Sequence, residues 1–228
     1  MNNVNKMKNI FADKASFILR KMLSCPDQKW VVRDFIGQQG VSLGMAQGVI
    51  ETMAQSGYIE RVKRGPDSYS LLTDKERLFK DWCKDYQFDF NEVYTYYSTN
   101  KNILGRLKEY LKDKAYGFTL HAGANLMTSY VMTDHVHFYF QSESWDKDIL
   151  ELRQSLDLIE LVRGGNIHIV RPYYKKSVFV NSQIIRGYKV VSNLQLCLDL
   201  YGYQPRGQEQ ADYLKTVLAE KGKSFYGF

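Results

Sequence analysis

The 228-residue chain has few of the residues that form disulfide bonds or metal sites, with three cysteines and four histidines. Cys25, Cys83 and Cys197 lie far apart and match neither a disulfide framework nor the spacing of zinc ligands, so we expect reduced structural thiols. No apolar run reaches the roughly 20 residues that span a bilayer. The polar N-terminus also lacks the apolar stretch of a secretory signal. These absences predict a cytoplasmic protein with no membrane partner.

The chain does have an excess of basic residues. Lys and Arg total 31 against 25 Asp and Glu, which gives a formal net charge of +6. This balance favours a polyanionic partner, although the excess is small. The hydrophobic fraction of 44% is that of a globular protein, and the length suits two unequal domains. We predict an α+β protein with a smaller domain at residues 1–88 and a mixed α/β domain at residues 89–228.

Three short helices are expected in the smaller domain. Apolar residues recur at helical spacing over residues 15–23, 30–39 and 46–53. Gly40 supplies the permissive backbone for a tight turn between the second and third helices. Ser42 is suited to cap the third helix, because its hydroxyl can accept a bond from an unpaired amide of the first turn.

A strand hairpin is expected after the third helix, with strands at residues 58–63 and 69–72 and a basic turn at 64–68. Three helices followed by such a hairpin resemble a winged helix-turn-helix domain, here covering residues 13–86. In such domains the third helix enters the major groove of DNA, and the hairpin usually lies along the neighbouring phosphates. The resemblance therefore implies binding to double-stranded DNA.

Candidate DNA contacts follow from projecting the third helix. Gly44 and Gln47 face away from the core, and Gln47 is the best candidate base reader because glutamine can bond adenine through two hydrogen bonds. Ser42 is a candidate phosphate contact. Phosphate contacts are also expected from Arg33, Arg61, Lys63 and Arg64. The third helix has no Lys or Arg, so we expect modest base readout; a solvated charged hairpin or a protein-interaction module has the same pattern.

The larger domain is predicted to mix helices and strands. Helical spacing indicates helices at residues 74–86, leading out of the hairpin, and then at 103–111, 120–131, 145–156, 191–201 and 207–221. Strand patterns occur at residues 136–140, 158–162, 166–170 and 177–180, with a hairpin turn expected at 163–166. The tyrosine-rich stretch 89–99 is interpreted as the seam between the domains.

Two histidines raise the question of a metal site. His135 and His137 lie two apart on an expected strand, so both side chains face one side. Only Asp134 or His168 is a candidate third ligand, and paired histidines on a strand are more often structural. We therefore predict no bound metal and no cofactor.

No catalytic constellation can be assembled from the remaining residues. A two-metal nuclease needs a Glu-x-Lys pair, but an aliphatic residue fills the lysine position after Glu160. A nucleotidyltransferase needs a Gly-Ser pair before two alternating carboxylates, and this pair is missing before Asp146 and Asp148. The sequence thus predicts a protein that is not an enzyme.

Residues 186–212 resemble the C-terminal segment of AbiEi-type antitoxins of type IV toxin-antitoxin systems, which are associated with abortive phage infection. The shared pattern is Val-Ser-x-x-Gln-Leu-x-Leu-Asp-Leu, then Gly-Tyr, then Arg-Gly-x-Glu-x-Ala. Its polar and glycine positions of interest are Ser192, Gln195, Asp199, Arg206 and Gly207. A structural interpretation, in which Asp199 or Arg206 forms an internal ion pair, stands beside a direct functional one.

The resemblance implies a repressor that binds inverted repeats at its own promoter, as a homodimer on the DNA, and opposes a nucleotidyltransferase toxin without a stable complex. Two alternatives stay open. One is a winged-helix regulator whose C-terminal domain senses a ligand or dimerises. The other is a DNA-processing enzyme with an unrecognised site.

Overall fold

The computed structural model describes residues 9–227, which form two compact units. The first unit extends to Tyr86, and the second runs from Gln87 to Tyr226. The strands form one two-stranded and one six-stranded sheet. Helices accompany both sheets, so the predicted α+β class is confirmed.

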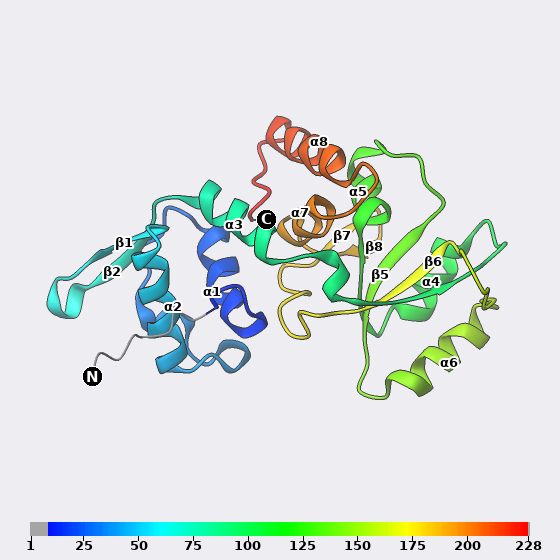
Figure 1. The fold of residues 1–228 in the computed structure, drawn as a ribbon, viewed down its shortest axis with the longest axis horizontal. Helices are drawn as coiled ribbons and strands as arrows, with labels where there is room; N and C mark the ends of the chain where they lie inside the picture. The colour runs from blue at the N-terminus through cyan, green and yellow to red at the C-terminus, as the bar shows by residue number, and fades with distance from the viewer. Residues whose placement is uncertain (1–8, 228) are drawn as a thin grey trace. The chain divides into compact units, whose positions relative to one another are not determined.

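The first unit contains three α-helices and one hairpin. Its elements are α1 (Asp13–Ser24), α2 (Leu43–Gln55), β1 (Ile59–Val62), β2 (Tyr69–Leu72) and α3 (Lys75–Asp85). The hairpin strands pair in antiparallel register, with Ile59 opposite Leu72 and Val62 opposite Tyr69. Figure 1 shows the hairpin extending away from α1 and α2.

The core of this unit is built from the apolar stripes that the sequence predicts. On α1 the buried side chains include Ile18, Leu19, Met22 and Leu23, and on α2 they include Ala46, Val49, Ile50 and Met53. Fully burying one such aliphatic side chain contributes roughly 1.5 to 3 kcal/mol. The predicted first and third helices are therefore confirmed.

The prediction of a second helix at residues 30–39 is wrong. Two short 3₁₀ turns, Val32–Phe35 and Gln38–Gly40, stand in its place. Trp30 exchanges two backbone hydrogen bonds with Ser70 of the hairpin, so the segment begins as an extended bridge. Gly37 and Gln39 then adopt positive φ angles of 81° and 53°, which a right-handed helix does not allow.

The second unit is an α/β arrangement around the six-stranded sheet. Its strands are β3 (Glu92–Tyr96), β4 (Ala115–Thr119), β5 (Val136–Gln141), β6 (Ile167–Arg171), β7 (Gln183–Ile185) and β8 (Tyr188–Val190). Its helices are α4 (Ile103–Leu111), α5 (Leu120–Thr128), α6 (Trp145–Ser155), α7 (Asn193–Tyr201) and α8 (Gly207–Glu220). The strand order is β3-β6-β5-β4-β8-β7, and β5 and β6 are parallel neighbours joined through α6.

Helices cover both faces of this sheet (Figure 1), with α5, α7 and α8 on one face and α4 and α6 on the other. Successive side chains of β5 reach these two layers in turn, because side chains alternate along a strand. Tyr139 donates a hydrogen bond to Asp199 of α7, whereas Phe140 packs on Trp145 of α6. Helix α7 is buried from Asn193 to Leu200 because β4, α5 and α8 all contact it.

Two predicted strands and one predicted turn in this unit are wrong. Residues 158–162 make only one bridge, between Ile159 and Tyr97, and Val162 is fully exposed. Residues 177–180 are a run of turns. Residues 163–166 do not form a hairpin turn, because β6 pairs with β3 and β5 and not with residues 158–162.

Three regions of strand were not predicted. Strand β3 lies in the stretch interpreted as a seam, and β4 precedes α5 directly. The hairpin of β7 and β8 turns at Arg186 and Gly187, whose φ angles are 51° and 79°. Two positive φ angles in a two-residue turn are the geometry that suits a β-hairpin. The helices expected from residue 103 onward are confirmed, although α5 ends at Thr128.

Among the described residues no helix combines the length and hydrophobicity needed to cross a membrane. In the same part of the chain, none of the three cysteines forms a disulfide.

Candidate functional site

Helix α2 presents a polar face to solvent. Ser42 caps the helix, and its Oγ accepts a hydrogen bond from the Met45 amide at 3.2 Å. Gly44, Gln47 and Glu51 are exposed, and positions three or four apart lie on one side of a helix. The structure thus brings the helix residues singled out from the sequence onto one surface.

The hairpin adds its basic residues beside this surface. Arg61 on β1 forms an ion pair with Glu51 of α2 at 4.0 Å, with the two side chains 30% and 58% exposed. Because an exposed pair of this kind contributes at most about 1 kcal/mol, the contact orients Arg61 more than it stabilises the fold. Lys63 and Arg64 are exposed near the hairpin tip. Arg33 is also exposed, on the 3₁₀ turn Val32–Phe35 that packs against α2.

The family-like motif is buried in its first half. Ser192 caps α7, and its Oγ accepts a bond from the Gln195 amide at 3.1 Å. Asp199 is fully buried, and its carboxylate accepts hydrogen bonds from Gln195 Nε2 at 2.7 Å and Tyr139 Oη at 2.9 Å. Thr119 Oγ1 donates a third bond, at 2.5 Å. These bonds tie α7 to β4 and β5.

Sequence reasoning did not identify Thr119 and Tyr139 as partners of Asp199, which lie 80 and 60 positions away in the chain. The only local signal was the carboxylate itself, in the middle of an apolar helix. A buried carboxylate requires several donors, because an unpaired one is costly to remove from water. In its described contacts Asp199 is bonded by neutral donors, whereas Arg206 pairs with Glu209, so the internal ion pair of the structural interpretation is found at Arg206.

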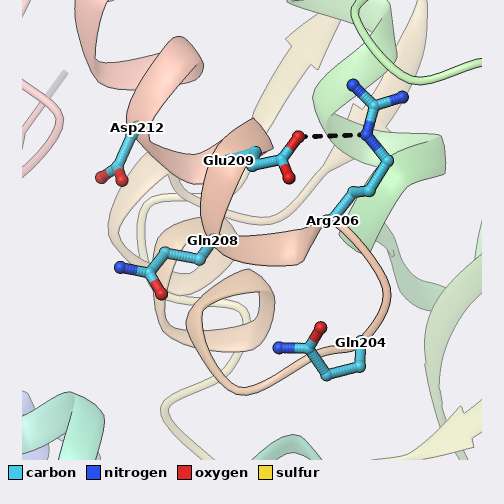
Figure 2. Close-up of a pocket in the computed structure, with 5 residues that line it drawn as sticks. All are labelled: Gln204, Arg206, Gln208, Glu209 and Asp212. Carbon is cyan, nitrogen blue, oxygen red and sulfur yellow. Dashed lines mark hydrogen bonds and ion pairs between the residues drawn. The ribbon is translucent and has the colours of Figure 1, made fainter.

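The second half of the motif opens a polar pocket at the start of α8. Figure 2 shows its lining residues, and the pocket measures about 310 Å³. Arg206 Nε donates to Glu209 Oε2 at 3.1 Å, and its guanidinium lies 5.3 Å from the ring of Tyr130. Glu209 thereby raises the pKa of Arg206. Gly207 is required by packing, because a Cβ there would lie 2.2 Å from the carbonyl oxygen of Leu200.

All four histidines of the chain lie in one part of the second unit. Three rings stack, with centroids 5.0 Å apart between His135 and His168 and 4.1 Å apart between His137 and His168. His121 lies across Tyr203, whose ring packs at 5.6 Å from His121 and 5.5 Å from His137. Within residues 9–227 no group of three or more His, Cys, Asp or Glu side chains could hold a metal ion.

The two buried histidines of this stack, His137 and His168, favour the neutral state. Burial, assisted by the charges of the neighbouring histidines, lowers the pKa of His137 to about 2, and burial and His135 lower that of His168 to about 4. Of the other titratable groups around them, Asp134 reaches only the solvent-facing side, 3.9 Å from His135 Nε2. Tyr203 Oη contacts His137 Nε2 at 3.3 Å. No acid in these contacts compensates a charge on His137.

We therefore expect the second unit to lose stability in mild acid. Both folded-state pKa values lie below the ordinary value of 6.5, so the unfolded chain takes up protons first as the pH falls. The loss begins near pH 6.5 and continues to about pH 4 for His168 and about pH 2 for His137, which alone contributes about 2 kcal/mol between pH 7 and pH 5. Urea unfolding at the two pH values measures it. A His137→Phe variant with the same acid sensitivity as the parent would contradict the assignment.

A family model for transcriptional regulators described as AbiEi antitoxins of type IV toxin-antitoxin systems matches residues 71–219. The match covers the second unit from β3 to α8 and includes the motif at α7 and α8. No curated protein and no solved structure gives a significant match. Because the model spans more than half of the chain, the chain belongs to the AbiEi antitoxin family, a family of transcriptional regulators in type IV toxin-antitoxin systems.

Proposed function

We propose that the protein represses its own operon by binding inverted repeats in promoter DNA, and that it opposes a nucleotidyltransferase toxin without forming a stable complex. The family membership carries this proposal. Residues 1–88 would bind DNA as a winged helix-turn-helix domain, and residues 89–228 would carry the antitoxic activity.

The polar face of α2 supports the DNA-binding part. The helix has 13 residues, about 20 Å at 1.5 Å per residue, and the major groove admits a helix of this kind. Gln47 would meet a base edge, with Ser42 and Gly44 close to the backbone at the helix start. Because α2 lacks Lys and Arg, the phosphate attraction would come from Arg33 and from the hairpin residues Arg61, Lys63 and Arg64.

Two copies on one operator would satisfy the two halves of an inverted repeat, since protein and DNA then share a two-fold axis. This makes a homodimer on DNA the assembly that we propose. Family members are transcriptional regulators, and we propose no catalytic activity for the second unit.

A reporter and a rescue experiment test the two activities separately. A reporter gene is placed under the promoter of the operon to measure repression, and in a second experiment the chain is coexpressed with the nucleotidyltransferase that we propose as its toxin. Gln47→Ala is expected to weaken operator binding about 5- to 100-fold, the value of a bidentate base contact, and to leave toxin rescue intact. Gln28→Ala, exposed outside α2, serves as the matched control.

The outcomes separate the competing functions. Repression without rescue would favour a regulator whose second unit senses a ligand or dimerises. Metal-dependent DNA cleavage that is lost in a His135 or Glu160 variant would favour a DNA-processing enzyme.

A further inference from the structure

The crossover from β5 through α6 to β6 creates a pocket that the proposed function does not use. The two strands are parallel neighbours, with Phe138 opposite Ile169 and Tyr139 opposite Val170, so their carboxyl ends lie at the same edge of the sheet. Helix α6 begins at that edge, four residues after β5 ends. In open α/β sheets, ligands bind outside the carboxyl ends of the strands, where helix N-termini also point.

A pocket of about 170 Å³ occupies this place. The described residues that line it are Phe140, Gln141, Ser142, Trp145, Arg171, Pro172 and Lys175. Two of these residues are cations and none is acidic. The pocket therefore combines two cations, a hydroxyl and the start of a helix, whose first turn also carries Asp146 and Asp148.

Trp145 gives this pocket a fixed wall. Its ring lies 5.9 Å from Phe140 and 5.2 Å from Tyr94, and the Arg171 guanidinium carbon lies 5.2 Å from the ring centroid. The side chain is 7% exposed, yet its indole N–H has no hydrogen-bond partner in the part of the chain that the structure describes. Because this nitrogen is buried, Trp145 contributes the ring to the pocket as a fixed apolar wall.

Two acidic residues outside the pocket hold its polar groups in the unbound state. Arg171 Nη1 pairs with Glu92 Oε2 at 3.2 Å, and Ser142 Oγ donates to Asp148. The N-cap residue of α6, Ser144, makes no side-chain cap bond, which leaves amides of the first turn available. An anion would compete with Glu92 for Arg171 and would gain Lys175 and the helix start.

We propose that this pocket binds the phosphate group of a small molecule, between Arg171, Lys175 and the first turn of α6. Planar guanidinium and flexible ammonium groups are the side chains that most often hold phosphate. The shared chemistry fits either inorganic phosphate or a nucleoside monophosphate. Phosphate binding at this pocket does not depend on the DNA-binding or antitoxic activities of the protein.

Calorimetric titration of the full chain with inorganic phosphate, adenosine monophosphate and adenosine, at constant ionic strength, tests the site. Arg171→Gln and Lys175→Gln are each expected to weaken binding about tenfold, the size of one charged hydrogen bond. Glu92→Gln is expected to tighten it about threefold, because it releases Arg171. Arg163→Gln and Lys176→Gln, which change the same charges on exposed residues outside the lining, should leave binding unchanged.

Comparing the affinities of these ligands shows whether the pocket binds a nucleotide or inorganic phosphate. Tighter binding of the monophosphate than of inorganic phosphate supports a nucleotide, and equal binding, with none for adenosine, supports the phosphate alone. Equal affinity in all variants would overturn the proposal. Displacement of bound phosphate by a duplex DNA fragment would also overturn it, because the cations would then belong to a DNA-binding surface. Glu92→Gln keeps the assay decisive even if Arg171→Gln unfolds, since it predicts a gain rather than a loss.

Discussion

Replacing Arg61, Lys63 and Arg64 together by alanine is expected to weaken binding to a promoter fragment roughly a hundredfold at about 0.15 M salt. Each phosphate contact contributes about 0.9 to the slope of log K against log salt, so three lost contacts reduce the slope by about 2.7. Arg61 contributes a phosphate contact to this slope only if DNA displaces its ion-pair partner Glu51, which lies 4.0 Å away. A gel-shift titration over a range of salt concentrations measures both quantities.

A matched triple variant controls for net charge. Lys101, Lys147 and Arg163 are exposed residues of the second unit, and their replacement by alanine removes the same three charges. Glu51→Gln adds a test in the opposite direction, because it frees Arg61 and should strengthen binding. Unchanged affinity and slope in the hairpin triple variant would rule out the hairpin as a phosphate contact.

Replacing Asp199 by alanine is expected to cost the second unit about 3 to 5 kcal/mol, because three buried donors lose their acceptor at once. The donors are Thr119, Tyr139 and Gln195, at 2.5, 2.9 and 2.7 Å from the carboxylate. Since the bonds join α7 to β4 and β5, toxin rescue should fail as the unit unfolds. Thermal and urea unfolding followed by circular dichroism measure the loss.

Two milder variants make this prediction specific. Tyr139→Phe removes one donor and leaves the carboxylate in place, so it should cost only about 1 kcal/mol. Asp212→Ala removes a carboxylate that is 54% exposed on α8 and should change stability little. If Asp199→Ala were no more harmful than Asp212→Ala, the buried network would not be what holds α7 against the sheet.

The helices were predictable because their signal is local. Residues such as Ile18, Leu19 and Met22 repeat at helical spacing, and one stripe of a helix must be buried whatever packs on it. The same reasoning failed for residues 30–39, where Trp30 pairs with Ser70 across a long stretch of chain. A partner 40 positions away leaves no periodic trace near the tryptophan.

Strands were harder to predict because pairing decides them. Residues 158–162 are apolar enough for a strand, but only Ile159 finds a partner. Strand β3 lies in a tyrosine-rich stretch that was interpreted as a seam between domains, and it becomes a strand through five consecutive pairs with β6. Short apolar runs do not reveal which of them has a neighbour.

The residues of the candidate site also include some that could be predicted from local sequence and some that could not. Sequence position alone was enough to put Ser42 at a helix start and Gln47 on its outer face, because both depend on local helical geometry. It could not reveal that Arg61 pairs with Glu51, or that Asp199 is bonded by Thr119 and Tyr139. Nor could it reveal that Tyr203 packs between His121 and His137.

The sequence by itself determined the helices other than the one wrongly expected at residues 30–39, the excess of positive charge, and the motif at residues 191–211 that marks the family. Only the tertiary structure decided which strands pair, which motif residues are buried, and where a pocket forms between β5, α6 and β6. Helical periodicity and composition are properties of neighbouring residues, whereas burial, hydrogen-bond partners and pockets arise between segments that lie far apart in the chain.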